Sequence, residues 1–452
     1  MRIENFRKKV VCLPSFSIKP KSMDDLYQIY TGCPKIITDS RKACPDSIFF
    51  ALKGERFDGN DFAQSALSLG CNFAVVDRPE IADDRRYILV DDVLSTLQHL
   101  AREHRKKLDI PVIAITGTNG KTTTKELIKC VLGTKYEVCA TSGNLNNHIG
   151  VPLTILGISP LTQIAIIEMG ANHSGEIKTL CEIARPTCGL ITNIGKAHLE
   201  GFGSFEGVKQ AKKELYDYLN EHNGMIFYNE ENPILTGMLD HEKTTTIGYG
   251  GSEQSDCRGR VASASPYLQM ELHIGEESYP VSTRLAGVYN LENLLAAAAV
   301  GYFFTVPARR IVDALAAYTP QNNRSQVLRT ARNQLLLDDY NANPTSMSKS
   351  LNNFFEQISN PRMVILGDMF ELGNDAPQEH AAIVDLLLTQ KDVVRVVVGK
   401  HFYEAAKNVP DILAFNEIEE LKNWIADHPP DGMFILIKGS RGMKLEQLTG
   451  LL

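Results

Sequence analysis

From about residue 110 onward, short apolar runs of strand length alternate with longer stretches of helical periodicity. The runs PVIAITG, QIAIIEMG and TCGLITNIG each lead into such a stretch through a short connection. Strands that alternate with helices in this way form a parallel sheet with helices on both of its faces. We therefore expect an α/β fold whose central part is a parallel sheet.

This alternation changes character at three places along the chain. The first hundred residues mix short strands and helices, as in a small α/β unit, and residues 260–285 alternate in twos, which indicates antiparallel ribbons added to the central sheet. After the polar segment TPQNNRSQ, the runs QLLLDDY, MVILGDM, VVRVVVG and MFILIKG begin a Rossmann-like, doubly wound unit. We expect three domains, at residues 1–108, 109–319 and 320–452.

Composition excludes several classes of protein. The 452 residues have a net charge of -7 and no long run of lysine or arginine, which argues against nucleic acid and anionic membranes as partners. No segment reaches transmembrane length, and MRIENFRKKVVCLPSFSIKP lacks an apolar core of signal length. The nine cysteines are scattered and form no C-x-x-C pair, as expected for reduced thiols. We expect a cytoplasmic monomer with small-molecule partners.

The stretch GTNGKT joins a strand to a helix and is typical of a phosphate-binding loop. Its glycine turn would point backbone N–H groups at an anion, and the helix N-terminus would add partial positive charge. Lys121 can reach terminal phosphates and Thr122 can ligate magnesium, although an ordinary strand-to-helix turn is the alternative. Ile115 stands where the common loop has its first glycine, so this loop is shorter than in generic kinases and GTPases. The predicted phosphate-binding residues are Gly117, Thr118, Asn119, Gly120, Lys121, Thr122 and Thr123.

This short loop resembles that of the Mur ligase family, whose members are ATP-dependent amide-forming enzymes and include the folylpolyglutamate synthetases. Further stretches match the family in order: TSGNLNNHIGVPLTIL, IIEMGANHSGEI, TNIGKAHLEGFGS, KQAKKELY and GVYNLENLLAA. The resemblance implies a ligase of three domains: an N-terminal domain that binds the UDP-linked substrate, a central domain that binds ATP, and a Rossmann-like C-terminal domain. It also implies ATP and two Mg²⁺ ions as cofactors.

In this family the positions of Glu168 and His198 hold magnesium, together with that of Thr122. The reaction brings a carboxylate to a triphosphate, and divalent metal and lysine offset the repulsion between these anions. Lys212 in KQAKKELY stands where many of these ligases carry a carbamylated lysine. From the residues alone, a histidine such as His198 is more often an ordinary loop histidine, and Lys212 is by default part of a solvated helix face. The implied catalytic residues are Lys121, Glu168, His198 and Lys212.

Four stretches narrow the resemblance within the family: DSRKACPDSIFFALKGERFDGNDF, LLDDYNANPTSM, ILGDMFELG and KGSRGMKLE. They resemble the members that join D-alanyl-D-alanine to UDP-N-acetylmuramoyl-tripeptide through an acyl phosphate, which gives the nucleotide pentapeptide precursor of peptidoglycan. Those two compounds are the implied substrates. The chain departs from the usual pattern at Asn60 and Tyr289, where histidine is common, and at Asp339, where serine is common.

The resemblance also assigns contacts to individual residues. ATP contacts fall on Asn290, Asn293, Arg324 and Asp338. Substrate contacts fall on Ser40, Arg41, Asn144, Asn146, Asn147, Asn341, Asn343, Lys438, Ser440 and Arg441. Taken singly, the asparagines are also ordinary turn residues, and the C-terminal group is equally suited to helix capping or to the surface.

Three other functions compete with this interpretation. A ligase that adds the third amino acid to the same precursor usually carries a D-N-P-R type motif, which this sequence lacks. A non-catalytic sensor of UDP-muramyl peptides would not need Lys121, Thr122, Glu168 and His198 intact. A generic P-loop NTPase is disfavoured by the short loop and by the lack of a switch region.

Overall fold

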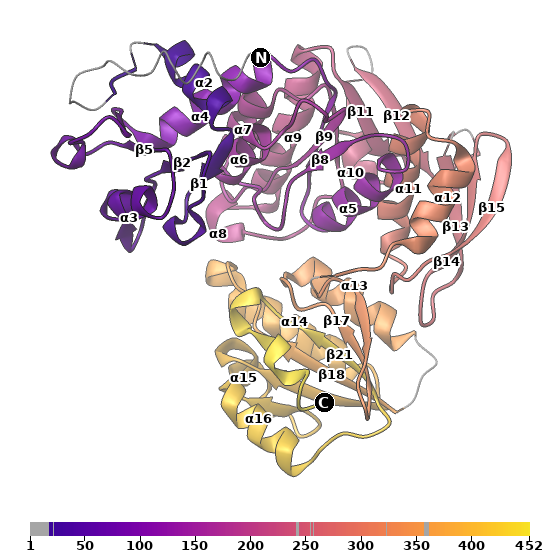
Figure 1. Cartoon of the computed structure of the whole chain (residues 1–452). Coiled ribbons are helices and arrows are strands. Elements are labelled where there is room, and N and C mark those ends of the chain that lie inside the picture. Colours follow the sequence, from indigo (N-terminus) through magenta and orange to yellow (C-terminus); the bar gives the residue numbers. More distant parts are fainter. Residues whose placement is uncertain are drawn as a thin grey trace.

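The computed structural model describes residues 18–20, 22–240, 244–253, 255, 257–321, 323–356 and 361–452. The start of the chain discussed above, through residue 17 and including Cys12, lies outside these residues. Three main sheets follow one another along the chain, each with its own helices (Figure 1). No helix in the described part of the chain is long and apolar enough to span a membrane. The expected α/β architecture is confirmed.

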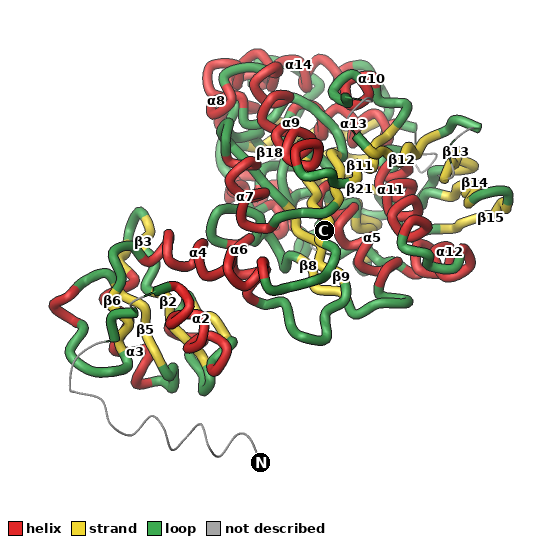
Figure 2. The backbone as a smooth tube through the Cα atoms, turned by 90° about the horizontal axis from the view of Figure 1, so that it is seen from above, coloured by secondary structure: helices red, strands yellow, loops and turns green. Residues whose placement is uncertain are grey.

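The N-terminal unit is built on a parallel sheet of strand order β1-β2-β5-β6. The sheet contains β1 (Lys35–Ile37), β2 (Ser47–Phe50), β5 (Phe73–Val76) and β6 (Tyr87–Leu89). Its helices are α2 (Met23–Gly32), α3 (Ala63–Ser68) and α4 (Val93–Lys106). A small ribbon of β3 (Lys53–Gly54) and β4 (Phe57–Asp58) extends from it, and the unit stands out from the rest of the molecule in Figure 2. It therefore offers a separate surface to one side of the central sheet.

The central unit holds a sheet of strand order β15-β14-β13-β12-β11-β10-β7-β9-β8. Neighbours from β13 to β8 run parallel, whereas β13, β14 and β15 are the antiparallel ribbons expected from the alternation in twos. The strands are β7 (Val112–Thr116), β8 (Val138–Ala140), β9 (Ile164–Glu168), β10 (Cys188–Ile191), β11 (Met225–Asn229), β12 (Thr245–Gly250), β13 (Cys257–Ser263), β14 (Gln269–Ile274) and β15 (Glu277–Ser282). The helices are α5 (Lys121–Leu132), α6 (Gly150–Leu156), α7 (Glu176–Ala184), α8 (Leu199–Phe202), α9 (Phe205–Glu221), α10 (Pro233–Thr236), α11 (Asn290–Phe303) and α12 (Ala308–Ala317).

Side chains of the central strands point alternately to two apolar cores. In β7, Val112 and Ala114 belong to the core under α4, α6, α7 and α9, whereas Ile113 and Ile115 belong to the core under α5, α11 and α12. This two-residue period explains why a strand buried on both faces appears in the sequence as one continuous apolar run.

The C-terminal unit has a sheet of strand order β16-β17-β21-β18-β19-β20, parallel except for the β16–β17 pair. Its strands are β16 (Gln326–Arg329), β17 (Gln334–Leu337), β18 (Arg362–Gly367), β19 (Val393–Val398), β20 (Leu413–Phe415) and β21 (Phe434–Lys438). Its helices are α13 (Pro344–Phe355), α14 (Ala376–Leu388), α15 (Lys400–Ala406) and α16 (Ile418–Asp427). Helices α13, α14 and α15 cover one face, and α16 covers the other.

One apolar core joins the N-terminal unit to the central unit. Ile48 and Val75 of the N-terminal sheet, Leu100 of α4 and Ile167 of β9 all belong to it. Arg105 in α4 adds buried hydrogen bonds to the carbonyl oxygens of residues 108, 110, 184 and 185. The two cores of the C-terminal unit are instead almost entirely its own, with Ala286 as the buried residue that the central unit adds, so the first two units form one mechanical body.

We expect this arrangement to give two unfolding transitions in calorimetry of the full chain. Leu100→Ala and Leu351→Ala remove the same side chain from the shared core and from the C-terminal core, and both leucines are fully buried. Each loss should cost about 2–5 kcal/mol and lower the midpoint of a different transition. A single transition that both variants shift would contradict the division into two bodies.

Candidate functional site

The phosphate loop lies at the carboxyl edge of the central sheet, between β7 and α5. Gly117 and Gly120 have φ of 139° and 79°, in the region that favours glycine. A Cβ at Gly117 would lie 2.1 Å from Thr192 Oγ1, and one at Gly120 would lie 2.6 Å from Asn293 Oδ1. The loop therefore packs against its neighbours so closely that only glycine fits at these two positions.

Asn193, which the sequence did not single out, fixes the loop from the end of β10. Its backbone oxygen accepts the N–H of Thr118, and its side-chain oxygen accepts the N–H of Asn119 at 3.0 Å. Its amide donates back to the oxygen of Asn119 at 3.0 Å. The loop is thus held in one shape before any anion binds.

Lys121 lies over this loop and donates to the backbone oxygens of Gly117 and Thr118, at 2.7 and 3.0 Å. Burial lowers the pKa of Lys121 to about 8, with Arg324 acting in the same direction and Glu168 opposing it. A bound polyanion would favour the charged ammonium, so phosphate binding and protonation of Lys121 support each other.

Glu168 ends β9 with a carboxylate that is 2% exposed. Its Oε1 accepts the hydroxyl of Thr122 at 3.1 Å and the amide of Asn146 at 2.9 Å. The fully buried Lys125 places its Nζ 3.9 Å from Oε2, and no donor among the described residues forms a hydrogen bond to that oxygen. A buried carboxylate oxygen left in this state is costly unless a cation binds it.

The oxygen donors of Glu168 and Thr122 fit Mg²⁺ better than they fit a metal that is bound by protein ligands alone. The described residues contain no group of three His, Cys, Asp or Glu side chains able to hold a metal ion. Mg²⁺ commonly uses one or two carboxylates and completes its shell with water and phosphate oxygens. The free oxygen of Glu168 beside the Thr122 hydroxyl offers such an incomplete shell.

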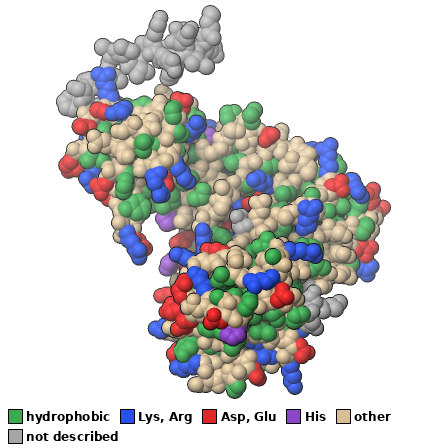
Figure 3. All heavy atoms as spheres, turned by 60° about the horizontal axis from the view of Figure 1, so that its bottom comes forward, with side chains coloured by type: hydrophobic (Ala, Val, Ile, Leu, Met, Phe, Trp, Pro, Cys, Tyr) green, Lys and Arg blue, Asp and Glu red, His purple; other side chains and the backbone are tan. Residues whose placement is uncertain are grey.

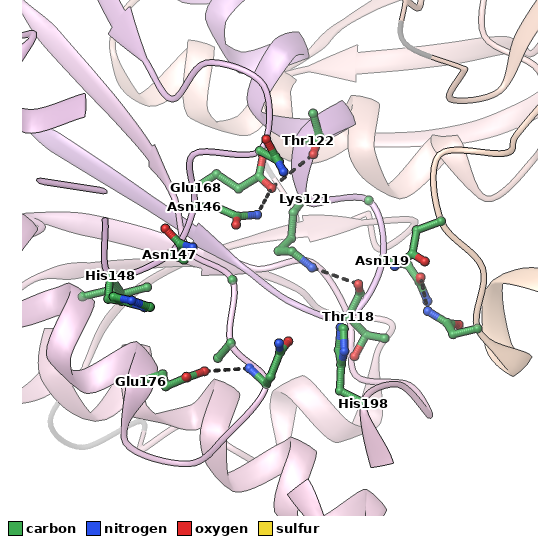
Figure 4. Close-up of a pocket in the computed structure, with 18 of the residues that line it drawn as sticks. Thr118, Asn119, Lys121, Thr122, Asn146, Asn147, His148, Glu168, Glu176 and His198 are labelled. Atoms are coloured by element: carbon green, nitrogen blue, oxygen red, sulfur yellow. Dashed lines mark hydrogen bonds between the residues drawn. The ribbon is translucent and has the colours of Figure 1, made fainter. Parts of the chain in front are cut away.

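His198 directly precedes α8, with a left-handed φ of 51°. It lines the same cavity as Lys121 and Glu168, and in the view of Figure 4 Lys121 lies between the two. Its Nδ1 contacts the carboxylate of Glu371 in the C-terminal unit, a partner that the sequence did not indicate. His198, the predicted metal ligand, therefore also contacts a residue that is distant in the sequence.

Lys212 is buried, at 2% exposure, so the solvated helix face considered from the sequence is wrong for this residue. Its Nζ lies 3.4 Å from the backbone oxygen of Ala171 and 5.3 Å from the centre of the Phe202 ring. Burial, together with the nearby charge of Lys121, lowers the pKa of Lys212 to about 7. The amine is thus partly neutral near pH 7, unlike an ordinary lysine.

Glu214 in α9 shapes the wall opposite the phosphate loop, although the sequence pattern did not indicate a role for this residue. Its two carboxylate oxygens accept the N–H groups of Gly175 and Lys178, at 2.6 and 2.9 Å. Glu176 likewise accepts the N–H of Asn172 at 2.7 Å. These two glutamates hold the start of α7 and the loop before it against the cavity.

The resulting cavity has a volume of about 780 Å³ and lies between the central and C-terminal units. Figure 3 shows the surface hollowed where the units meet, with Lys, Arg and His side chains near its edge. Predicted residues that line it include Thr118, Asn119, Gly120, Lys121, Thr122, Asn144, Asn146, Asn147, Glu168, His198, Arg324, Asn341 and Asn343. Gly117 adjoins this group from the end of β7, so most of the predicted site converges on one space.

A second pocket adjoins the other side of the phosphate loop. It is lined by the remaining predicted ATP residues, Thr123, Asn290, Asn293 and Asp338, with Arg324 and Asn341 shared between the pockets. Lys438, predicted to contact substrate, lies here too, with its Nζ 2.6 Å from an oxygen of Asp338. The structure thus groups Lys438 with the predicted nucleotide residues.

Tyr289, one of the departures from the family pattern, joins two units at this pocket. Its hydroxyl lies 2.9 Å from Ser325 Oγ, and burial raises the pKa of Tyr289 well above its ordinary value. The neighbouring Val288 donates its N–H to Asn353 Oδ1 of α13 at 3.1 Å. A tyrosine here therefore serves as a contact between the central and C-terminal units.

Four predicted substrate residues lie outside both pockets. Ser40 and Arg41 belong to the N-terminal unit, where the exposed Arg41 pairs with Asp39 at 2.7 Å. Ser440 accepts the N–H of Phe370, at 2.9 Å. Arg441 is exposed, and its guanidinium lies 5.2 Å from the centre of the Tyr340 ring.

Asn60, another departure, is buried in the N-terminal unit. Its amide donates to carboxylate oxygens of Asp58 at 2.7 Å and Asp77 at 2.8 Å. These two bonds order the turn that follows β4. The asparagine has a structural role there that does not depend on a bound ligand.

Three family descriptions match successive parts of the chain. They are "Mur ligase family, catalytic domain" at residues 35–113, "Mur ligase middle domain" at 115–301 and "Mur ligase, glutamate ligase domain" at 323–441. UDP-N-acetylmuramoyl-tripeptide--D-alanyl-D-alanine ligase of Bacillus subtilis (strain 168) is 34% identical, with 92% of each chain covered. The enzyme of the same name from Escherichia coli (strain K12) is also 34% identical, again with 92% of each chain covered.

Solved structures agree with these matches. MurF from Acinetobacter baumannii superimposes with a TM-score of 0.85 at 31% identity, covering 97% of this chain and 99% of that one. MurF ligase from Thermotoga maritima, solved in complex with ADP, gives a TM-score of 0.80 at 26% identity and covers 92% and 96%. The arrangement of all three units is therefore shared with these structures.

Asp339 is the third departure from the family pattern, and we expect it to lower the stability of the protein in a pH-dependent way. It is 3% exposed, neither carboxylate oxygen has a hydrogen-bond partner among the described residues, and burial raises its pKa from 3.8 to about 6. Because the folded pKa is higher, the native state gains stability as pH falls from 6 toward 4, and the buried charge destabilises it above 6. Asp339→Ser should therefore add up to about 3 kcal/mol at pH 8 and much less at pH 4.

Urea unfolding of the wild type and of Asp339→Ser at pH 8 and pH 4 measures this difference. Asp339→Asn, which removes the charge at nearly constant size, serves as the control and should show the same pH dependence relative to the wild type. Equal effects of the substitutions at both pH values would show that folding does not raise the pKa of this carboxyl group.

Proposed function

The chain belongs to the Mur ligase family, and we propose that it joins D-alanyl-D-alanine to UDP-N-acetylmuramoyl-tripeptide with hydrolysis of ATP to ADP and phosphate. The product would be the UDP-N-acetylmuramoyl-pentapeptide used for peptidoglycan. The observation that carries this proposal is the convergence of the phosphate loop, Glu168 with its free buried oxygen and His198 around one cavity. Relatives with this activity in their names align over 92% of their length.

The phosphate loop would hold the β- and γ-phosphates, with Lys121 released from the loop carbonyls to contact them. Thr122 and Glu168 would hold one Mg²⁺, and Glu168 and His198 a second. These ions supply the positive charge that allows the substrate carboxylate to approach the γ-phosphate. Adenosine contacts would come from Asn290, Asn293 and Asp338 in the second pocket.

The reaction then has two steps. A carboxylate oxygen of the tripeptide attacks the γ-phosphorus, the bond to ADP breaks, and an acyl phosphate forms. The amine of D-Ala-D-Ala attacks the acyl carbon, loses a proton, and phosphate leaves as the amide forms. Lys121, next to the transferred group, stabilises the charge that develops on its oxygens.

The C-terminal unit would protect this acyl phosphate from water. The Asn343 amide donates to Asn119 Oδ1 at 2.8 Å across the cavity, and the guanidinium of Arg324 lies 3.7 Å from the centre of the Tyr340 ring. Water excluded from the cavity cannot compete with the incoming amine. Asn341 and Arg441 lie near enough to this side to position the dipeptide.

The UDP end of the substrate would bind the N-terminal unit through Ser40 and Arg41, and Asn144, Asn146 and Asn147 would contact the peptide. The protein would act in the cytoplasm as a monomer. The eight described cysteines that are free thiols agree with a reducing compartment.

Coupled assays with and without D-Ala-D-Ala test the proposal. The wild type should form the nucleotide pentapeptide, detected by mass, with one ADP and one phosphate for each product molecule. Lys121→Ala should lower kcat by about 10²–10³-fold, the loss seen when one donor to a transition-state oxyanion is removed. Lys129→Ala, an exposed lysine on the same helix, is the matched control. Tight binding of the tripeptide without turnover would indicate a sensor instead.

Lys212 should react with CO₂ in a pH-dependent way. Its neutral amine adds CO₂, forming an N–C bond and releasing one proton, and gives a carbamate. Because burial lowers the pKa to about 7, the neutral amine and hence the carbamate should increase as pH rises through 7. With ¹³C-bicarbonate, a carbamate signal is expected at pH 8, reduced at pH 6, absent in Lys212→Ala and retained in Lys213→Ala. The absence of a carbamate signal at pH 8 would refute the carbamylation of Lys212.

A further inference from the structure

The loop between β10 and α8 is where the C-terminal unit meets the central unit. The N–H of Lys196 donates to Thr345 Oγ1 at 3.1 Å, and its ammonium lies 2.7 Å from an oxygen of Glu379. A Cβ at Gly195 would come within 3.0 Å of Thr345 Oγ1, so the surfaces are in close contact. His198 belongs to the same loop, and docking of the C-terminal unit therefore acts directly on it.

Glu371 is the C-terminal residue that contacts the His198 ring. Both residues have left-handed backbones, with φ of 51° for His198 and 62° for Glu371. Non-glycine residues adopt this region at a cost, and two of them meet here side chain to side chain. The Phe202 ring packs edge-on against the imidazole, 6.4 Å between centres. The ring thus has a packing partner in its own unit and a polar partner in the other.

The loop that carries Glu371 is itself well fixed. The N–H of Met369 donates to His380 Nε2 at 3.0 Å, and the N–H of Phe370 donates to Ser440 Oγ at 2.9 Å. Both acceptors are buried. The backbone immediately before Glu371 is therefore anchored, and its carboxylate is presented from a rigid support.

The contact also bears on which ring nitrogen is available. Nδ1 faces the Glu371 carboxylate, without a hydrogen bond of regular geometry in this arrangement. This leaves Nε2 as the nitrogen that would bind an ion. Metal-binding histidines generally depend on such a carboxylate partner, which fixes both the tautomer and the orientation of the ring.

We infer that Glu371 is a positioning residue that orients the His198 imidazole for a divalent ion when the C-terminal unit is docked. The inference rests on the proposed function, in which His198 holds the second ion. Glu371 itself is not among the residues that line the cavity. Binding of that ion and docking of the C-terminal unit would consequently favour each other.

Measurement of Mn²⁺ binding tests this inference without turnover. The EPR signal of free Mn²⁺ is followed in the presence of the UDP-tripeptide and the non-hydrolysable β,γ-imido analogue of ATP. The wild type should bind two ions. Glu371→Ala should raise the Kd of the weaker ion about 10–100-fold, the usual effect of losing such a partner. Glu371→Gln keeps an acceptor for the Nδ1 proton and should give a smaller rise. The other ion, at Thr122 and Glu168, should bind unchanged and reports intact folding.

Two further variants separate the possible explanations. Glu379→Ala removes the Lys196 ion pair at the same contact surface without touching His198, and should leave both ions unchanged within about twofold. If it weakens the second ion as much as Glu371→Ala does, docking alone matters and the positioning role is refuted. If His198→Ala weakens the second ion but Glu371→Ala does not, the inference fails and the proposed function stands. If no ion depends on His198, its metal role fails as well.

Discussion

The structure around the cavity depends on holding one carboxylate side chain, that of Glu168, inside the protein. The Thr122 hydroxyl and Asn146 amide satisfy one oxygen, and the ammonium of Lys125 lies near the other. These partners come from α5 and from the loop before α6, so both elements must dock on the end of β9 in one arrangement. The same requirement brings the phosphate loop beside the asparagines of residues 144–147. A buried carboxylate with one unused oxygen thus organises the site and leaves room for an ion.

Much of the fold could be predicted because its strands are buried on both faces. The runs around residues 111–117, 163–170 and 187–195 are mostly apolar, and β7, β9 and β10 lie within them. Several strands were not anticipated, among them two at the edges of the C-terminal sheet. Strand β16 overlaps a segment that reads as a polar linker and is only partly buried, and β20 has three residues, too few for a period to appear. Both are edge strands, where the neighbouring strand rather than the local sequence decides the structure.

The residues of the site likewise divide into those that could be predicted from the sequence and those that could not. Residues 117–123 could be predicted because they are contiguous and their chemistry depends on a local turn. Lys212 was ambiguous, because its lysine neighbours resemble a solvated face, and only the packing of α9 shows that it is buried. Asn193, Glu214 and Glu371 could not be predicted, since each acts on a residue distant in sequence or in another unit. Local patterns identify groups that bear chemistry, and tertiary contacts decide which groups support them.

The core shared by the N-terminal and central units has a consequence for substrate choice. Because Ile48, Leu100 and Ile167 pack in one body, the distance from the surface around Arg41 to the carboxylate of Glu168 is set by the fold. Only the C-terminal unit, with its separate cores, is free to adjust. A molecule bound at both ends must therefore match this fixed distance in length. One that is a residue too short or too long would place its reacting end away from the phosphate loop even if every individual contact were available.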